Sequence, residues 1–122
     1  MKSYIKHDEW RIIEEGFDPK LNRISESLCS LGNGRMGQRA NFEECYSGDS
    51  LQGSYVAGVY YPDKTRVGWW KNGYPEYFAK VINSANWIGL DIAIDGTPLD
   101  LAKWQVDDFR RELNMKEGYL LR

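Results

Sequence analysis

A regular alternation of apolar and polar positions marks the clearest strand of this chain, at residues 88–94. The apolar positions of the alternation are Ile88, Leu90, Ile92 and Ile94. A period of two predicts a half-buried strand with one wet face. Asp95-Gly96 is a hairpin turn signal, so Leu99 and Leu101 are expected on the returning limb. Pro98 has no N–H group to donate, which places that limb at a sheet edge.

Three other segments have the composition of strands. Residues Trp10–Glu15 predict a short strand closed by Gly16, and Ser54–Tyr61 is rich in residues that favour strands. The last segment, FRRELNMKEGYLLR, predicts a second hairpin with its turn around Lys116–Gly118. Alternate residues of that hairpin are expected to share one face, namely Phe109, Arg111, Leu113 and Met115.

One short helical segment is expected near residues 19–31. Asp18 is the predicted N-cap, with Pro19 in the first helical position. The apolar residues at helical spacing are Leu21, Ile24 and Leu28. Gly32-Asn33-Gly34 is then predicted to end the helix, because glycine tolerates the left-handed backbone found at helix ends. The chain as a whole is predicted to be mainly β, with sandwich-type layering.

Residues 62–80 have few turn signals and many aromatic side chains, which is unusual for a surface loop of that length. The aromatic run comprises Tyr60, Tyr61, Trp69, Trp70, Tyr74, Tyr77 and Phe78. Adjacent strand residues point to opposite faces, so Trp69 and Trp70 cannot both face one core in an extended segment. The rings could stack on sugar or meet another protein surface. We favour the interface, because a single small core cannot use all of them.

Length and charge narrow the class of protein. The chain has 122 residues, which suits one domain, and its formal net charge is −2. Basic residues are interspersed with acidic ones, which argues against binding to nucleic acid or to a membrane surface. No apolar stretch approaches the roughly 20 residues that span a bilayer. The N-terminus lacks the apolar segment of a secretory signal, and two isolated cysteines favour a reducing, cytoplasmic location.

Candidate chemistry within these residues is sparse. His7 is the only histidine, so the chain holds neither a histidine-based catalytic triad nor a multi-histidine metal site. Carboxylates that could serve glycosidic chemistry are Glu43, Glu44, Asp49, Asp63, Asp107 and Asp108. Sequence spacing does not place any two of them across a bond, and a solvated structural role is favoured.

The glycine-rich stretch SLGNGRMGQRA matches neither of the patterns with a known phosphate-binding geometry. We interpret it as a tight turn that leads into a strand. Arg35 and Arg39 would flank Met36 on that strand and are expected to form ion pairs at an interface.

Several of these segments together resemble one family. The segments SLGNGRMGQRANFEE, YSGDSLQGSY, GVYYPDKTRVGWWKNGYPEYF and DLAKW are similar to the N-terminal region of glycoside hydrolase family 65, closest to its maltose phosphorylase group. Kojibiose and nigerose phosphorylases are near relatives. The resemblance runs from about Trp10 to the last residue. The chain departs from the family pattern at Arg35, where an aromatic residue is usual, and at Ala40, where glycine is usual.

The resemblance implies both a fold and an activity. Residues 1–122 would be a single partial domain, part of an N-terminal β-sandwich of the galactose-mutarotase-like super-sandwich type, and the family's (α/α)6 barrel would lie outside them. The complete enzyme would split maltose, or another α-linked glucosyl disaccharide, with inorganic phosphate. Inversion at the anomeric carbon would give β-glucose 1-phosphate and glucose, without a cofactor. The family's catalytic and phosphate-binding residues lie in the barrel, so no catalytic residue is assigned here and this chain alone is expected to be inactive.

The resemblance also implies partners. In the family the sandwich packs on the barrel and contributes to a homodimer, which makes protein the expected partner of the aromatic run. A sharper hypothesis places Trp69, Trp70, Lys71 and Asn72 at the mouth of the substrate cleft or at an interface. Two alternatives remain open: a stand-alone carbohydrate-binding module and a hydrolase of the same family. The linkage also remains open among maltose, kojibiose, nigerose and trehalose.

Overall fold

The computed structural model describes residues 4–64 and 75–122. The helix and the strands found there are β1 (Ile5–His7), β2 (Arg11–Glu15), α1 (Asn22–Leu28), β3 (Leu31–Gly32), β4 (Met36–Gln38), β5 (Ser54–Val56), β6 (Tyr60–Lys64), β7 (Tyr77–Val81), β8 (Ala93–Ile94), β9 (Thr97–Pro98), β10 (Arg110–Asn114) and β11 (Tyr119–Leu121). The predicted fold class, mainly β with one short helical segment, is confirmed.

The largest sheet joins the two ends of the chain. Its order is β1-β2-β10-β11, and every neighbouring pair is antiparallel. The predicted hairpin β10–β11 is confirmed: Asn114 Oδ1 accepts hydrogen bonds from the N–H groups of Lys116 (3.1 Å) and Glu117 (3.0 Å). Gly118 closes this turn with φ of 71°. Met115 is 49% exposed, so it does not share the buried face as predicted.

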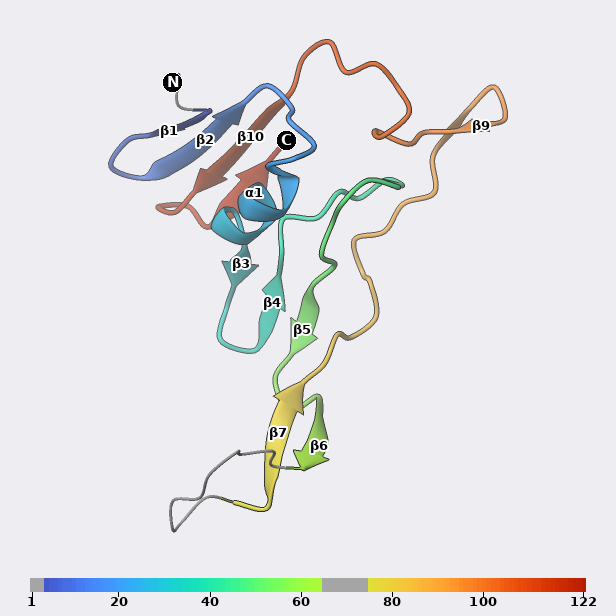
Figure 1. Ribbon diagram of the computed structural model, residues 1–122. Coiled ribbons are helices and arrows are strands. Elements are labelled where there is room, and N and C mark those ends of the chain that lie inside the picture. The colour runs from blue at the N-terminus through green and yellow to red at the C-terminus, as the bar shows by residue number, and fades with distance from the viewer. Residues whose placement is uncertain (1–3, 65–74) are drawn as a thin grey trace.

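Helix α1 lies against one face of this sheet, as Figure 1 shows. The helix begins after Leu21, and Asp18 instead stabilises the preceding turn by accepting the Lys20 N–H at 3.0 Å, so the predicted N-cap is wrong. Its buried side is polar, whereas Ile24 and Leu28 are about half exposed at 51% and 45%. The helical spacing therefore located the helix but not the side that faces the sheet.

The second sheet has the order β3-β4-β5. Gly32 ends β3, and Asn33 and Gly34 lie in the turn between β3 and β4. The predicted role of Gly32-Asn33-Gly34 as the end of the helix is therefore wrong, and the predicted tight turn is confirmed. Asn33 Oδ1 accepts the Arg35 and Met36 N–H groups at 3.0 and 2.8 Å. Gly34 adopts φ of 82°, the left-handed conformation that glycine allows at no steric cost.

The single strand predicted at Ser54–Tyr61 is two strands. Gly58, with φ of 85°, turns the chain between β5 and β6. Strand β6 then pairs with β7, and this hairpin extends away from the first sheet (Figure 1). Within the stretch predicted as an aromatic loop at residues 62–80, residues 62–64 and 77–80 belong to these two paired strands. We call residues 60–64 and 75–81 the β6–β7 arm.

The strand predicted at residues 88–94 is mostly absent. Only Ala93–Ile94 pairs, with Thr97–Pro98, around the predicted turn, where Asp95 and Gly96 have φ of 49° and 77°. Pro98 lies on an edge strand, because β8 and β9 form a sheet of two strands. The predicted burial is wrong: the apolar side chains exposed by 41% to 57% are Leu90, Ile92 and Ile94. Among residues 4–64 and 75–122, no second layer covers these side chains.

The core lies between the large sheet and α1. One part of it is aliphatic and consists of Cys29, Ala40 and Leu113, with Ile12, Leu31 and Leu120 packed around them. The other part is an aromatic cluster of Phe17, Phe42, Tyr46 and Phe109, whose neighbouring ring centroids lie 4.9–6.0 Å apart. Four of these five pairs are edge-to-face, an arrangement that adds favourable interaction beyond the area that the rings bury.

Charged side chains are buried between α1 and the large sheet. Arg111 and Glu14 are both 1% exposed, with Arg111 Nε 3.4 Å from Glu14 Oε2. Ser25 Oγ donates to the other Glu14 oxygen at 2.8 Å, and Arg111 Nη2 donates to Asn22 Oδ1 at 3.2 Å. Buried charges persist only when they are paired and hydrogen-bonded, which explains why the helix turns its polar side inward.

Candidate functional site

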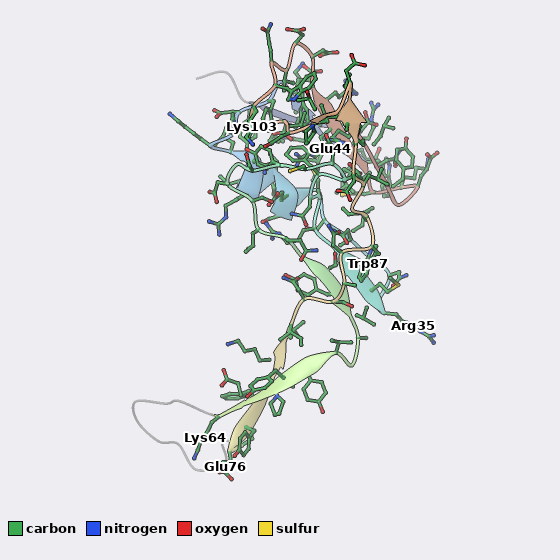
Figure 2. All side chains as sticks on the ribbon, turned by 90° about the vertical axis from the view of Figure 1, so that its right-hand side faces the viewer. Arg35, Glu44, Lys64, Glu76, Trp87 and Lys103 are labelled. Carbon is green, nitrogen blue, oxygen red and sulfur yellow. The ribbon has the colours of Figure 1, made fainter. Side chains whose placement is uncertain are left out.

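The predicted site residues Trp69, Trp70, Lys71 and Asn72 lie outside the described residues. In the chain they fall between β6 and β7, which pair in the register Tyr60↔Val81 to Lys64↔Tyr77. Figure 2 shows the flanking residues Lys64 and Glu76 at the far end of the arm. The described part of the candidate site is therefore the β6–β7 arm itself.

Aromatic side chains occupy both faces of this arm. The exposed aromatic residues are Tyr60, Tyr61, Tyr77 and Phe78, with exposed fractions of 44% to 59%. Tyr60 and Tyr61 are neighbours on one strand, so their rings lie on opposite faces, and the same holds for Tyr77 and Phe78. A two-stranded hairpin is marginally stable at best without a layer beside it. The arm thus has the composition of a contact surface rather than of a solvated hairpin.

Ion pairs link the two strands of the arm. Lys80 Nζ lies 3.4 Å from Asp63 Oδ2, and Lys64 Nζ lies 3.9 Å from Glu76 Oε1. The four side chains are 40–70% exposed, so these pairs contribute little to stability. They give the arm a mixed charge on top of its aromatic surface.

A shallow cavity of about 410 Å³ separates the base of the arm from β4 and β5. Arg35, Met36 and Tyr60 are among the side chains that line it. Arg35 is exposed and forms no ion pair with the described residues. Arg39 forms an ion pair with Glu26, with its Nη2 3.7 Å from Glu26 Oε2. Its Nε also donates to the Leu51 carbonyl at 2.8 Å. The predicted arginine ion pairs are thus found for Arg39 only.

The candidate carboxylates hold structural contacts. Arg122 donates hydrogen bonds to Glu44 and Glu43, with N–O distances of 2.6 and 2.8 Å. Burial acts to raise the pKa of Glu44, but the hydrogen bonds and charge of Arg122 lower it overall. Asp49 lies 3.6 Å from Arg23. These contacts support the structural interpretation of the carboxylates over a catalytic one.

A second concave site was missed by the sequence analysis. It is a cleft of about 710 Å³ lined by residues from three loops, among them Phe17, Tyr46 and Trp104. The three rings are 29 to 87 positions apart in the chain, so no local pattern joins them. The one available signal was that Trp104 lies in the segment DLAKW, which carries part of the family resemblance.

Among residues 4–64 and 75–122, no group of three or more histidine, cysteine, aspartate or glutamate side chains is arranged to hold a metal ion. No helix in the described part of the chain is long and apolar enough to cross a membrane.

Comparisons with known proteins place the chain in a family. The family model described as glycosyl hydrolase family 65, N-terminal domain, matches residues 12–122. The maltose phosphorylase of Bacillus subtilis is 59% identical over 94% of this chain. A kojibiose phosphorylase of Thermoanaerobacter brockii is 30% identical over the whole chain, and the α,α-trehalose phosphorylase of the same organism is 32% identical over 94% of it.

A solved structure supports the same relationship. A putative kojibiose phosphorylase from the human microbiome superposes with a TM-score of 0.81 and 36% identity over 94% of this chain. The chain spans only 14–15% of the length of these relatives and of that structure. The fold, the family match and the identities agree, and the chain belongs to glycosyl hydrolase family 65, within the family's N-terminal domain.

Proposed function

We propose that this chain is the N-terminal sandwich domain of an inverting disaccharide phosphorylase whose substrates are maltose and inorganic phosphate. The observation that carries the proposal is the difference in identity among the relatives. The chain is 59% identical to a maltose phosphorylase but 30–33% identical to the kojibiose and trehalose phosphorylases. Such a difference favours maltose, with β-glucose 1-phosphate and glucose as products.

The proposed chemistry lies outside this chain. Phosphate is already an anion and attacks the anomeric carbon directly, so no carboxylate is needed to activate water. One carboxylic acid in the (α/α)6 barrel protonates the leaving oxygen. No cofactor takes part, and phosphate is a co-substrate. The described carboxylates with structural contacts are consistent with this division, in which residues 1–122 form a single partial domain without catalytic residues.

The proposed role of the chain is to support the barrel and a homodimer of a cytoplasmic enzyme. Its large exposed apolar surfaces support this role. They are the aromatic faces of the β6–β7 arm, the outer side of α1 with Ile24 and Leu28, and the stripe of Leu90, Ile92 and Ile94. Exposed patches of this kind mark interaction surfaces. Trp69, Trp70, Lys71 and Asn72, at the connection of the arm, are proposed to shape the mouth of the substrate cleft.

A second candidate function is a carbohydrate-binding module, which the exposed tyrosines of the arm favour. A third is a hydrolase of the same family, which would use water in place of phosphate. The hydrolase differs from the main proposal in its product, and the binding module differs in showing no turnover.

The test is an assay of the complete reading frame that encodes this chain. The purified protein is given maltose, kojibiose, nigerose or trehalose, with and without phosphate, and glucose 1-phosphate and glucose are measured. Phosphate-dependent glucose 1-phosphate from maltose alone is expected. Glucose released without phosphate would show a hydrolase, and sugar binding without turnover would show a binding module. The 122-residue chain, assayed beside it, is expected to be inactive.

A further inference from the structure

The cleft that the sequence analysis missed lies between three loops, away from the β6–β7 arm. These loops follow β2, β4 and β9, and they contribute Phe17, Tyr46 and Trp104 respectively. Trp104 is 38% exposed, so part of its indole face is open to solvent. Lys20 and Asp49, both exposed, add one charge of each sign. The volume of about 710 Å³ lies within the range of clefts that hold small ligands.

Asp100 links the loop that carries Tyr46 to the loop that carries Trp104. Its Oδ1 accepts the N–H groups of Ser47 and Ala102, each at 3.0 Å, and its Oδ2 lies 3.2 Å from Lys103 Nζ. Ser47 follows Tyr46 in the chain, and Ala102 precedes Trp104 by two positions, so one buried carboxylate sets the spacing of the two rings. Figure 2 shows Lys103 in the folded body, well separated from the arm.

The ring of Trp104 is held in place independently of any ligand. Its backbone N–H donates to the Asp100 carbonyl at 3.1 Å, and its indole Nε1 donates to the Pro98 carbonyl at 3.2 Å. An indole anchored at its polar edge presents a fixed apolar face. Preorganised walls lower the entropic cost of binding.

The hydroxyl of Tyr46 is a buried polar atom without a hydrogen-bond partner among the described residues. Its ring packs edge-to-face on Phe42 at 4.9 Å and on Phe17 at 5.9 Å. A Cβ on Gly48 would lie 2.3 Å from the Tyr46 hydroxyl, so the ring takes this position because residue 48 has no side chain. Burial and the charges of Glu26, Asp49 and Asp100 raise the pKa of Tyr46, which keeps the hydroxyl protonated.

We propose that this cleft is an accessory binding site for a pyranose sugar, with Trp104 as the stacking face and the Tyr46 hydroxyl as a donor to one sugar oxygen. Asp49, on the same loop as Tyr46, supplies an acceptor for sugar hydroxyls. Aromatic faces with a few polar groups between them suit the C–H faces and hydroxyls of a sugar. Lys20 and Asp49 balance each other in charge, so the cleft does not favour an anion such as phosphate over a neutral sugar.

Ligand-induced changes in the ¹⁹F resonance of Trp104 test the proposal. The complete protein is labelled with 5-fluorotryptophan, and the ¹⁹F resonance of Trp104 is assigned by its loss in Trp104→Phe. Titration with maltose or glucose is expected to move this resonance saturably in the millimolar range. Tyr46→Phe keeps the ring and removes the unpartnered hydroxyl, so the midpoint is expected to rise about tenfold while the resonance persists.

A matched control is Tyr60→Phe, which removes a tyrosine hydroxyl from the arm and is expected to leave the midpoint unchanged. A Trp104 resonance that does not respond to either sugar overturns the proposal, whether the cleft is empty or covered by another part of the protein. An equal midpoint in Tyr46→Phe overturns the role of the hydroxyl. The choice of maltose and glucose rests on the proposed function, but phosphorylase activity is measured separately and does not depend on this result.

Discussion

At the scale of single residues, the least expected feature is the ion pair of Arg111 and Glu14 inside the fold. The alternation Phe109, Arg111, Leu113 predicted that Arg111 would share a face with two apolar residues, and all three are buried. The partner could not be predicted, because it requires the register in which Arg111 pairs with Glu14 across β10 and β2. Arg111 also lies over the rings of Phe42 and Phe109, at 5.1 and 5.4 Å.

Removing one partner of this pair leaves the other charge buried alone. Arg111→Ala is therefore expected to lower the free energy of unfolding by roughly 3–5 kcal/mol, measured by urea denaturation. Arg23→Ala is the matched control: this arginine is exposed and pairs with the exposed Asp49, so a loss below about 1 kcal/mol is expected. Equal losses in the two variants would contradict the buried network.

Asp100 is expected to make stability depend on pH in the acid range. Hydrogen bonds from Ser47, followed by those from Ala102 and Lys103, hold the pKa of this carboxyl well below its ordinary value of 3.8. A pKa lowered by folding adds stability above the unfolded value, and that stability is lost as the pH falls through the native pKa. The Tm of the wild-type chain should thus fall on acidification below about pH 4.

The variant Asp100→Asn isolates this contribution. Its Tm is expected to be lower than that of wild type at neutral pH and to approach the wild-type value in acid, because the wild-type carboxyl is then protonated too. Asp91→Asn, at an exposed position, serves as the control and should follow wild type throughout. A constant difference in Tm between Asp100→Asn and wild type across this range would contradict the assignment.

At the scale of elements, local chemistry predicted the turns better than the strands. The predicted turns are found at Asn33-Gly34, Asp95-Gly96 and Gly118. A turn can be predicted locally because the preference for left-handed backbone belongs to the residue type, glycine above all. The strand boundaries depend on partners. Gly58 divides the predicted strand Ser54–Tyr61. Helix α1 packs its polar side on the sheet because Glu14 and Arg111 of the sheet form hydrogen bonds with it.

Gly34 offers a test of the β3–β4 turn. Gly34→Ala is expected to destabilise the chain by about 1 kcal/mol, because φ of 82° is costly for a residue with a Cβ even where space is free. Gly37→Ala is the control on the adjoining strand, since its nearest contact would be an ordinary 3.9 Å. If chemical denaturation shows Gly34→Ala to be as stable as Gly37→Ala, the left-handed turn is wrong.

At the scale of the whole molecule, the chain buries one small core and exposes several apolar surfaces. The alternation at residues 88–94 predicted a buried face that the described structure does not provide. A sequence pattern reports that a face is suited to burial, but it does not say which layer covers it. The candidate segment Trp69–Asn72 lies outside the described residues, and its proposed role stays a prediction.

These exposed surfaces predict that the 122-residue chain self-associates when produced alone. Unpaired strand edges and the aromatic faces of the β6–β7 arm both invite contact with a second chain. Light scattering at increasing protein concentration is expected to show a rising mass. A mass that stays at 14.2 kDa at high concentration would contradict this expectation.

The proposed phosphorylase reaction is tested most directly by the anomeric configuration of its product. The complete reading frame that encodes this chain is incubated with maltose and phosphate, and early products are followed by ¹H NMR before the glucose anomers equilibrate. β-Glucose 1-phosphate and glucose are expected in equal amounts, with no turnover without phosphate. α-Glucose 1-phosphate, or glucose without a phosphate ester, would contradict it.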